Sequence, residues 1–279
     1  MSSTLTARIS ALNIYPVKSC AGVALQQSRL SATGLQNDRR WMLVKPDGYF
    51  LTQRELPRMA LITPELKGDG IMLNAPGMPA IHVAGMSESH IREVVIWRDC
   101  CLAFDEGDIV AEWLSAFLQH TVRLVRFNDE RNRNSSRDWS GEVAAPNHFT
   151  DGFPILVISV ASLDDLNSRL KNPLAMNRFR PNIVIDGVDA YTEDRVDEIR
   201  GQEFCLKLVK PCARCKITTT NQETGIVEGD EPLLTLVQYR RNLQLKGVVF
   251  GQNAIIVSGT GTTVSVGESV SLSLHAITQ

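Results

Sequence analysis

One short segment, KPCARCK, carries side chains that can bind a metal or attack an electrophile. Its cysteines, Cys212 and Cys215, form a C-x-x-C motif directly after the strand-like run FCLKLV, and Lys210, Arg214 and Lys216 flank them. Cations beside a thiol favour the thiolate, which is the form that ligates metals and acts as a nucleophile. By itself the motif leaves three structures open: half of a zinc site, a redox disulfide, or two buried cysteines without chemistry.

The surrounding residues weigh against the first two of these structures. A structural zinc ion needs two more ligands at familiar spacing, and the sequence has neither a second C-x-x-C nor an H-x-H pair. A thioredoxin-like motif lies at a helix start in a βαβ unit, whereas KITTT, after Cys215, is typical of a strand. The motif alone therefore does not assign a metal or a reaction.

Two other clusters carry groups suited to binding an anion. NRFRPNIV places Arg178 and Arg180 at the entrance to a predicted strand, where alternation puts Arg180 and Asn182 on one face. Arginine forks suit phosphate and carboxylate. In YPVKSC, Lys18 and Ser19 end the first predicted strand and can together hold a phosphate. For each cluster the alternative is an ordinary solvated basic surface.

Short alternating or β-branched runs dominate the elements that must position these residues. They include ARISALNIYPV, WMLVKPDGYFLT, REVVIW and VRLVRF in the first part of the chain, and PILVISV, FRPNIVIDG and the C-terminal AIIVSGTGTTVSVGESVSLSL in the second. Amphipathic helices are predicted in three places. They are DIVAEWLSAFLQH with Asp108 as N-cap and Ile109 on the buried stripe, SLDDLNSRL starting at Ser162, and EPLLTLVQYRRN with Val237 on its apolar face. The predicted fold is mainly β with some α.

A polar, arginine-rich stretch, FNDERNRNSSRDWSGEVAAPNHF, has neither helical nor strand periodicity. It is the predicted junction between a first domain, 1–125, and a second, 126–279. A loop of this length is either a lid that contacts substrate or a disordered surface loop. The side chains by which it would cover the site are Arg131, Arg133, Arg137 and Trp139.

Composition excludes several classes of partner. The 279 residues, 43% of them hydrophobic, can bury one large core or two modest ones, and the net charge of −2 gives no field to recruit nucleic acid or an anionic membrane. The start, MSSTLTARIS, has no signal-peptide pattern, and no run reaches the roughly 18 apolar residues of a membrane span. Six cysteines in so long a chain favour reduced thiols and a cytoplasmic location.

Eight motifs, in order, resemble those of the MOSC family, the molybdenum cofactor sulfurase C-terminal domain proteins with their N-terminal β-barrel partner. The motifs are YPVKSC, DRRW, DGFP, FRPNIVI, Y-x-ED, KPCARCKITT, EPL-x-TL-x-x-YR and VFGQN. The resemblance is strongest to YcbX-type proteins and the mitochondrial amidoxime-reducing component, and it covers nearly the whole chain. It implies a MOSC core containing a β-barrel, a smaller N-terminal β-rich domain, and a pterin cofactor between them.

The resemblance also implies a division of roles within the site. Cys215, the second cysteine of C-x-x-C, corresponds to the ligand of a molybdenum–molybdopterin cofactor and the catalytic residue, and Cys212 to a neighbour without a ligand role. Mitochondrial members have a serine where this chain has Ala213 and a tyrosine where it has Asn253. The implied cofactor-binding residues are Lys18, Ser19, Arg39, Asp151, Arg180, Asn182 and Asn253.

The implied reaction is the two-electron reduction of N-hydroxylated compounds, such as hydroxylamines, amidoximes and N-hydroxylated base analogues, to the parent amine or amidine and water. The cysteines lack the spacing of a plant-type iron–sulfur cluster, so a separate reductase or ferredoxin is expected to supply electrons. No nucleic-acid or membrane partner is expected. The alternative function is sulfur transfer or cofactor delivery, with Cys215 carrying a persulfide.

Overall fold

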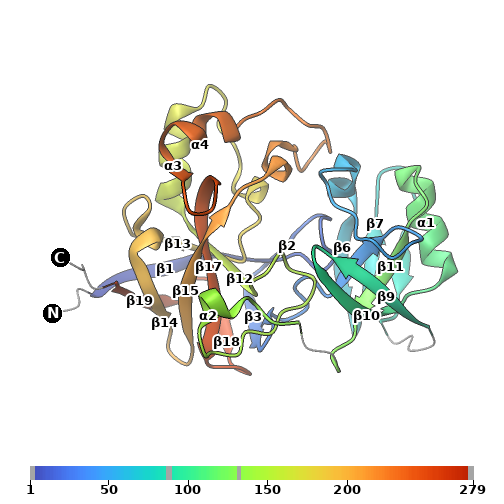
Figure 1. Ribbon diagram of the computed structural model, residues 1–279, viewed down its shortest axis with the longest axis horizontal. Coiled ribbons are helices and arrows are strands. Elements are labelled where there is room, and N and C mark those ends of the chain that lie inside the picture. Colours follow the sequence, from blue (N-terminus) through green and yellow to red (C-terminus); the bar gives the residue numbers. More distant parts are fainter. Residues whose placement is uncertain (1–3, 86–89, 131–132, 276–279) are drawn as a thin grey trace.

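The computed structural model describes residues 4–85, 90–130 and 133–275, so Arg131 lies outside the described residues. Strands dominate the chain, which confirms the prediction of a mainly β fold with some α. Figure 1 shows two strand-rich parts side by side along the long axis of the molecule. The larger part contains both ends of the described chain, and the smaller part contains α1 and its neighbouring strands.

The larger part is a β-barrel of seven strands. Their order in the sheet is β12, β13, β1, β19, β14, β15 and β17, and antiparallel pairing of β12 with β17 closes the ring. Two short strands, β2 and β16, extend the sheet. The bounds are β1 Thr4–Ile14, β2 Val23–Leu25, β12 Ile155–Ser159, β13 Ile183–Asp186, β14 Val196–Arg200, β15 Cys205–Ala213, β16 Arg241–Asn242, β17 Gly247–Ser258 and β19 Ser269–Leu274.

Alternation of apolar side chains along these strands fills the barrel. In β1, Ile9, Leu12 and Ile14 are fully buried, and they join a cluster that includes Leu206 of β15 and Leu272 of β19. The pairing of β1 with β13 shifts register between Ile9 and Ala11. This irregularity lets β1 keep its apolar side chains inward as the strand curves. Burial of this apolar surface is the main stabilisation of the barrel.

The smaller part consists of two sheets and helix α1. One sheet has four strands, β5 Trp41–Val44, β11 Arg123–Phe127, β10 Asp99–Asp105 and β9 Ile91–Ile96, and the other has three, β6 Thr63–Lys67, β7 Gly70–Asn74 and β8 Ile81–Val83. Outside these two sheets, a separate small sheet pairs strands from early and late in the chain. It consists of β18 Thr263–Ser265, β3 Gln27–Ser31 and β4 Gly34–Leu35. Trp41, Trp113 and Phe117 belong to the buried cluster that α1 forms with the sheets.

The helices lie close to their predicted positions, with corrected ends. In α1, Asp108–Leu118, the N-cap is Gly107, and Ile109 is 77% exposed while Val110 is buried, so the predicted stripe was wrong by one position at its start. In α3, Val160–Arg169, Ser159 is the N-cap, because its hydroxyl accepts a hydrogen bond from the Ser162 N–H. The other helical segments are α2 Arg137–Ser140, α4 Leu233–Tyr239 and the 3-10 turns Pro57–Leu61, Met176–Arg178, Thr192–Arg195 and Lys216–Thr219.

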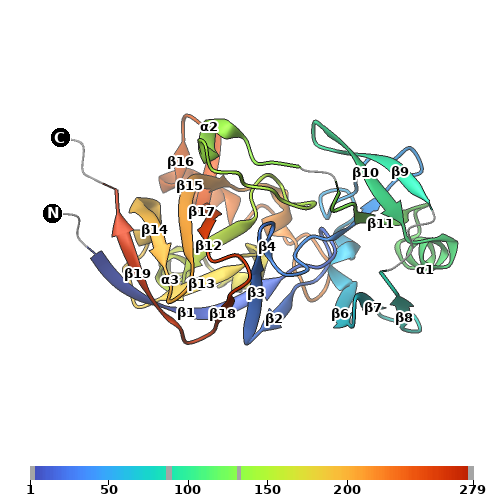
Figure 2. The ribbon, with the colours of Figure 1, turned by 90° about the horizontal axis from the view of Figure 1, so that it is seen from below.

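The first strand of the chain belongs to the barrel. β1 pairs with both β13 and β19, and Figure 2 shows it running alongside β19 at the end of the molecule where the chain begins and finishes. The N-terminal segment therefore crosses from the barrel to the smaller part before β5. The division at residues 125 and 126 stays a prediction. Within the described ranges, no helix is long and apolar enough to cross a membrane.

Candidate functional site

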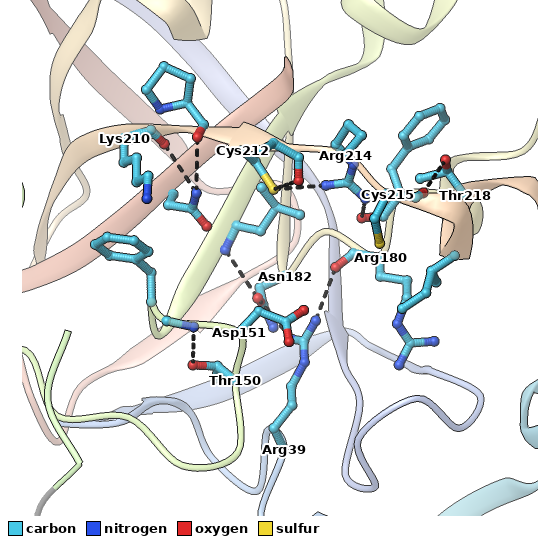
Figure 3. Close-up of a pocket in the computed structure, with 18 of the residues that line it drawn as sticks. Arg39, Thr150, Asp151, Arg180, Asn182, Lys210, Cys212, Arg214, Cys215 and Thr218 are labelled. Carbon is cyan, nitrogen blue, oxygen red and sulfur yellow. Dashed lines mark hydrogen bonds between the residues drawn. The ribbon is translucent and has the colours of Figure 1, made fainter. Parts of the chain in front are cut away.

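A pocket of about 240 Å³ gathers all the residues that the sequence nominated for the cofactor. Strand ends and loops from both halves of the sequence contribute to it: the loop after β1, the segment before β5, the residues just before β12 and β13, and the pair β15 and β17 with the turn after β15. Figure 3 shows the side chains converging. The lining includes Lys18, Ser19, Arg39, Asp151, Arg180, Asn182, Cys215 and Asn253.

The two cysteines of C-x-x-C have different surroundings. Both are free thiols; Cys215 is exposed, whereas Cys212 is half-buried at the end of β15. Arg214 Nη1 donates to Cys212 Sγ at 2.9 Å, and Nη2 donates to the Phe179 carbonyl at 2.7 Å. The thiol of Cys215 has no such partner among the described residues. Cys212 is thus already engaged, and Cys215 is the sulfur available to a ligand (Figure 3).

Lys18 and Asp151, which both line the pocket, form an ion pair between a buried ammonium and an exposed carboxylate. Lys18 Nζ donates to Asp151 Oδ1 at 2.6 Å and to the Phe149 carbonyl at 2.9 Å, and the Trp97 indole donates to the same carboxylate oxygen at 3.0 Å. Burial lowers the pKa of Lys18, and Asp151 opposes this. Although desolvation alone would raise the pKa of Asp151, Lys18 and Trp97 hold it well below its usual value. Asp151 is therefore a carboxylate at neutral pH.

Two arginines contact one aromatic ring. The Arg39 guanidinium lies 4.3 Å from the centroid of the Tyr15 ring, and that of Arg180 lies 4.2 Å from it. The buried carboxylate of Asp38 accepts from the Tyr15 backbone N–H at 2.8 Å and from Arg39 Nη1 at 2.6 Å. Burial raises the pKa of Tyr15 to about 12, so the ring stays neutral beside the two cations. Contact with the electron-rich ring stabilises both guanidinium groups.

Arg180 retains one unused donor. Its Nη1 donates to the Cys20 carbonyl at 2.7 Å, but its Nη2 is buried without a hydrogen-bond partner among the residues described. Burial lowers the pKa of Arg180 to about 10, which still leaves it charged at neutral pH. A buried charged donor without a partner is unfavourable, and an anion in the pocket would satisfy it.

Three of the predicted cofactor-binding residues have positive φ angles, in the left-handed region of backbone conformation. The φ angles are 64° at Ser19, 47° at Arg39 and 57° at Arg180. For residues with a Cβ this conformation is uncommon and costs about 1–3 kcal/mol. Their coincidence in one pocket is typical of a binding site whose surroundings impose the geometry.

The two nominated asparagines mainly hold the protein together. Asn182 Oδ1 accepts from the Leu156 N–H at 3.1 Å and from Arg39 Nη1 at 3.1 Å, and its Nδ2 donates to the Asn13 carbonyl at 3.2 Å. Asn253 Nδ2 donates to the Lys210 carbonyl at 3.2 Å, which ties β17 to β15. Asn182 thus positions Arg39, while the side-chain amide oxygen of Asn253, Oδ1, is left for a ligand.

Sequence reasoning missed part of the machinery that supports these residues. Tyr15 and Asp38 belong to the recognised motifs YPVKSC and DRRW, and Arg214 was noted only as a cation beside the cysteines, so the signal was present without the role. Their roles depend on contacts between segments far apart in the sequence, such as Arg214 with Phe179. Spacing along the chain does not reveal those contacts.

The described lining carries five cations, Lys18, Arg39, Arg180, Lys210 and Arg214, against the single carboxylate of Asp151. This excess suits an anionic ligand. In the part of the chain that the structure covers, no three His, Cys, Asp or Glu side chains gather in a group that could hold a metal ion. Fold and pocket together define a strand-rich protein with a cationic pocket and one available thiol at its edge.

Comparison with known proteins places the chain in a family. Residues 6–121 match the MOSC N-terminal beta barrel domain and residues 144–271 match the MOSC domain. Mitochondrial amidoxime reducing component 2 of Rattus norvegicus is 38% identical over 83% of this chain and 72% of its own length. Mitochondrial amidoxime-reducing component 1 of Homo sapiens is 35% identical over 95% of this chain and 82% of its own length. The chain belongs to the MOSC family that includes these amidoxime-reducing components.

Proposed function

We propose that this chain binds a molybdenum–molybdopterin cofactor through the Cys215 thiolate and reduces N-hydroxylated compounds. The observation that carries the proposal is the convergence of Cys215 and all seven nominated cofactor contacts on one cationic pocket. The MOSC domain match and the relatives named for amidoxime reduction support the same activity. The location in the cytoplasm remains a prediction.

The residues present fit such a cofactor. Molybdopterin carries a phosphate, and the unpartnered Nη2 of Arg180 is a buried donor that needs an anion. Lys18 and Ser19, both buried beside it in the pocket lining, add an ammonium and a hydroxyl. Arg39, held by Asp38 and Asn182, offers a second guanidinium. In this proposal these groups hold the pterin and its phosphate, and Cys215 holds the metal.

The bound cofactor would supply two-electron chemistry that cleaves an N–O bond. The balance for a hydroxylamine is R–NHOH plus two electrons and two protons, giving R–NH2 and water. Asp151 does not supply these protons, because its depressed pKa keeps it ionised at neutral pH. Its role is to orient Lys18, with which it is paired at 2.6 Å. Because the pocket is open to solvent beside Cys215, water can deliver the protons.

The electrons are proposed to come from a separate protein, a reductase or ferredoxin. The exposed position of Cys215 would bring the metal close to the surface, where a donor can approach it. With bound cofactor but no donor or chemical reductant, the protein should carry out a single turnover. Repeated turnover without either would contradict this part of the proposal.

The decisive experiment is the molybdenum and pterin content of the protein expressed in a cofactor-competent host. The native chain should contain both in near-stoichiometric amounts, Cys215→Ala should lose the metal, and Cys212→Ala, the matched control, should keep most of it. Equal loss from both variants would exclude the single-ligand assignment. Intact native protein without molybdenum or pterin would favour sulfur transfer, which a sulfane-sulfur assay on Cys215 would then detect.

A further inference from the structure

Lys210 differs from the other cations of the pocket. Lys18, Arg39, Arg180 and Arg214 each donate at least one hydrogen bond to an oxygen of the protein. For the Lys210 ammonium, no acceptor is found among the residues that the structure describes. The contacts of its ammonium are with two aromatic rings, at 5.0 Å from the centroid of Trp139 and 5.7 Å from that of Phe153.

The aromatic surroundings of Lys210 leave its ammonium without a hydrogen-bond acceptor from the described part of the protein. Ring faces attract a cation weakly but accept no strong hydrogen bond, so the three N–H donors of the ammonium are left to water or a ligand. Lys210 is half-buried and lines the pocket together with Phe153. A lysine at this place is therefore ready to pair with an anion that enters from solvent.

Trp139 comes from the long loop between β11 and β12. It lies in α2, which packs against β15 (Figure 2). Arg133, a buried residue before α2, donates from Nη1 to the carbonyls of His148 at 3.0 Å and Thr150 at 2.9 Å, and from Nε to Asp99 at 2.7 Å. These bonds fasten both ends of the loop. The loop that the sequence marked as a lid or a disordered segment thus contacts Lys210 through Trp139.

Lys210 and Cys215 lie at opposite ends of one wall of the pocket (Figure 3). Both belong to the segment from β15 to the turn that follows it, and Phe153 and Leu156 add apolar surface to the lining. A small flat molecule whose reacting group is at Cys215 would extend along this wall toward Lys210. Its far substituent would meet the ammonium.

We infer that Lys210, between Trp139 and Phe153, forms a substrate subsite that selects aromatic N-hydroxylated compounds carrying an anionic substituent, a carboxylate or phosphate, opposite the N-hydroxyl group. This inference rests on the proposed reductase function and adds the charge of the preferred substrate to it. The other cations of the pocket are already engaged with the protein or, in the proposal above, with the cofactor. Lys210 is free of both tasks.

The test compares 4-carboxybenzamidoxime with neutral benzamidoxime as substrates of cofactor-loaded protein. In Lys210→Met the ratio of kcat/KM for the anionic over the neutral substrate should fall about tenfold, mainly through KM, because a charge-assisted hydrogen bond is lost. Lys210→Arg should recover most of the ratio. The matched control is Lys207→Met, on the same strand but outside the pocket and paired with Asp197, which should leave the ratio as in the native chain.

Two further readouts separate failure of this inference from failure of the proposed function. Molybdenum content should be the same in Lys210→Met and the native protein; a loss would assign Lys210 to the cofactor and overturn the inference. Titration with 4-carboxybenzamidoxime should change the fluorescence of the protein, and the loss of this change in Trp139→Phe would assign it to Trp139. In Lys210→Met the affinity measured from this change should be about tenfold weaker. Binding without reduction would reject the reductase and keep the subsite, whereas an unchanged substrate ratio with normal turnover would reject the subsite alone.

Discussion

The pocket has two walls that differ in how the protein holds them. The buried wall, made of Lys18, Arg39 and Arg180 and supported by the Tyr15 ring that both arginines contact, connects loops from both parts of the molecule, and its charges are tied to backbone carbonyls and carboxylates. The strand wall, from Lys210 to Cys215 at the end of β15, is half-buried or exposed. Lys18 and Arg180 are 4% and 9% exposed, whereas Cys215 is open to solvent.

This difference separates two tasks. Buried charges are stable only if partners satisfy them, so the buried wall is part of the folding of the protein as well as of its binding site. The strand wall carries the groups of the proposed chemistry, Cys215 and Lys210, without such constraints. Substitutions in the buried wall should therefore reduce stability, and substitutions in the strand wall should change function at almost constant stability.

The largest effect is expected from Asp38→Asn. Asp38 is fully buried and accepts from both the Tyr15 N–H and Arg39, so the variant leaves the Arg39 charge without its carboxylate. Removal of one partner of a buried ion pair costs about 3–5 kcal/mol. Urea denaturation followed by circular dichroism measures the loss.

The control for this prediction is Asp186→Asn. Asp186 pairs with Arg8 at 3.9 Å on the surface, with 46% of the carboxylate side chain and 65% of the arginine exposed. Such pairs contribute less than about 1 kcal/mol. If Asp38→Asn were as mild as this control, the buried wall would not be a folding element, and the comparison of the two walls would fail.

A second, smaller effect is expected at Tyr15. Tyr15→Leu removes the ring that both Arg39 and Arg180 contact, and the affinity of cofactor-free protein for pyrophosphate should fall about tenfold as the two guanidinium groups lose this support. Tyr15→Phe keeps the ring and loses only the hydroxyl, which donates to the Pro181 carbonyl at 3.2 Å. In isothermal titration calorimetry, the pyrophosphate affinity of Tyr15→Phe should therefore be close to that of the native protein. An equal loss of affinity in Tyr15→Phe and Tyr15→Leu would assign the effect to the hydroxyl.

The two walls also differ in how far the sequence predicted them. Alternating runs predicted the strands, and the ordered motifs nominated the residues that line the pocket. Residue type did not predict that Ser19, Arg39 and Arg180 have positive φ angles, because tertiary contacts impose that conformation. Nor did it reveal that Arg39 and Arg180 both contact the Tyr15 ring or that Arg214 donates to the Phe179 carbonyl, since these contacts join segments distant in sequence. Local pattern thus predicts elements, and packing decides roles.

A third prediction concerns pH and Asp151. Because its folded-state pKa lies below the ordinary carboxyl value of about 3.9, the ionised group stabilises the fold above that value and the stabilisation is lost as pH falls through the folded pKa. The side chain is 66% exposed, so the effect at pH 7 should be about 1 kcal/mol. The difference in unfolding free energy between native and Asp151→Asn should stay constant from pH 7 to about 5 and shrink below about 4. Denaturation at several pH values tests this, and a difference that grew in acid would have the wrong sign.

The smallest effect is expected in the strand wall, at Cys212→Ser. The serine oxygen can still accept from Arg214, and the position is half-buried, so the unfolding free energy should change by less than about 0.5 kcal/mol. The same exchange at Cys20, which is fully buried beside Arg180 and whose thiol pKa burial raises to about 12, should cost about 1–3 kcal/mol. The two variants make the same chemical change, one in the strand wall and one at the residue whose carbonyl accepts from Arg180 of the buried wall. Equal costs would show that the walls are held alike, whereas the expected gap would tie stability to the buried wall and leave the strand wall free to change its chemistry.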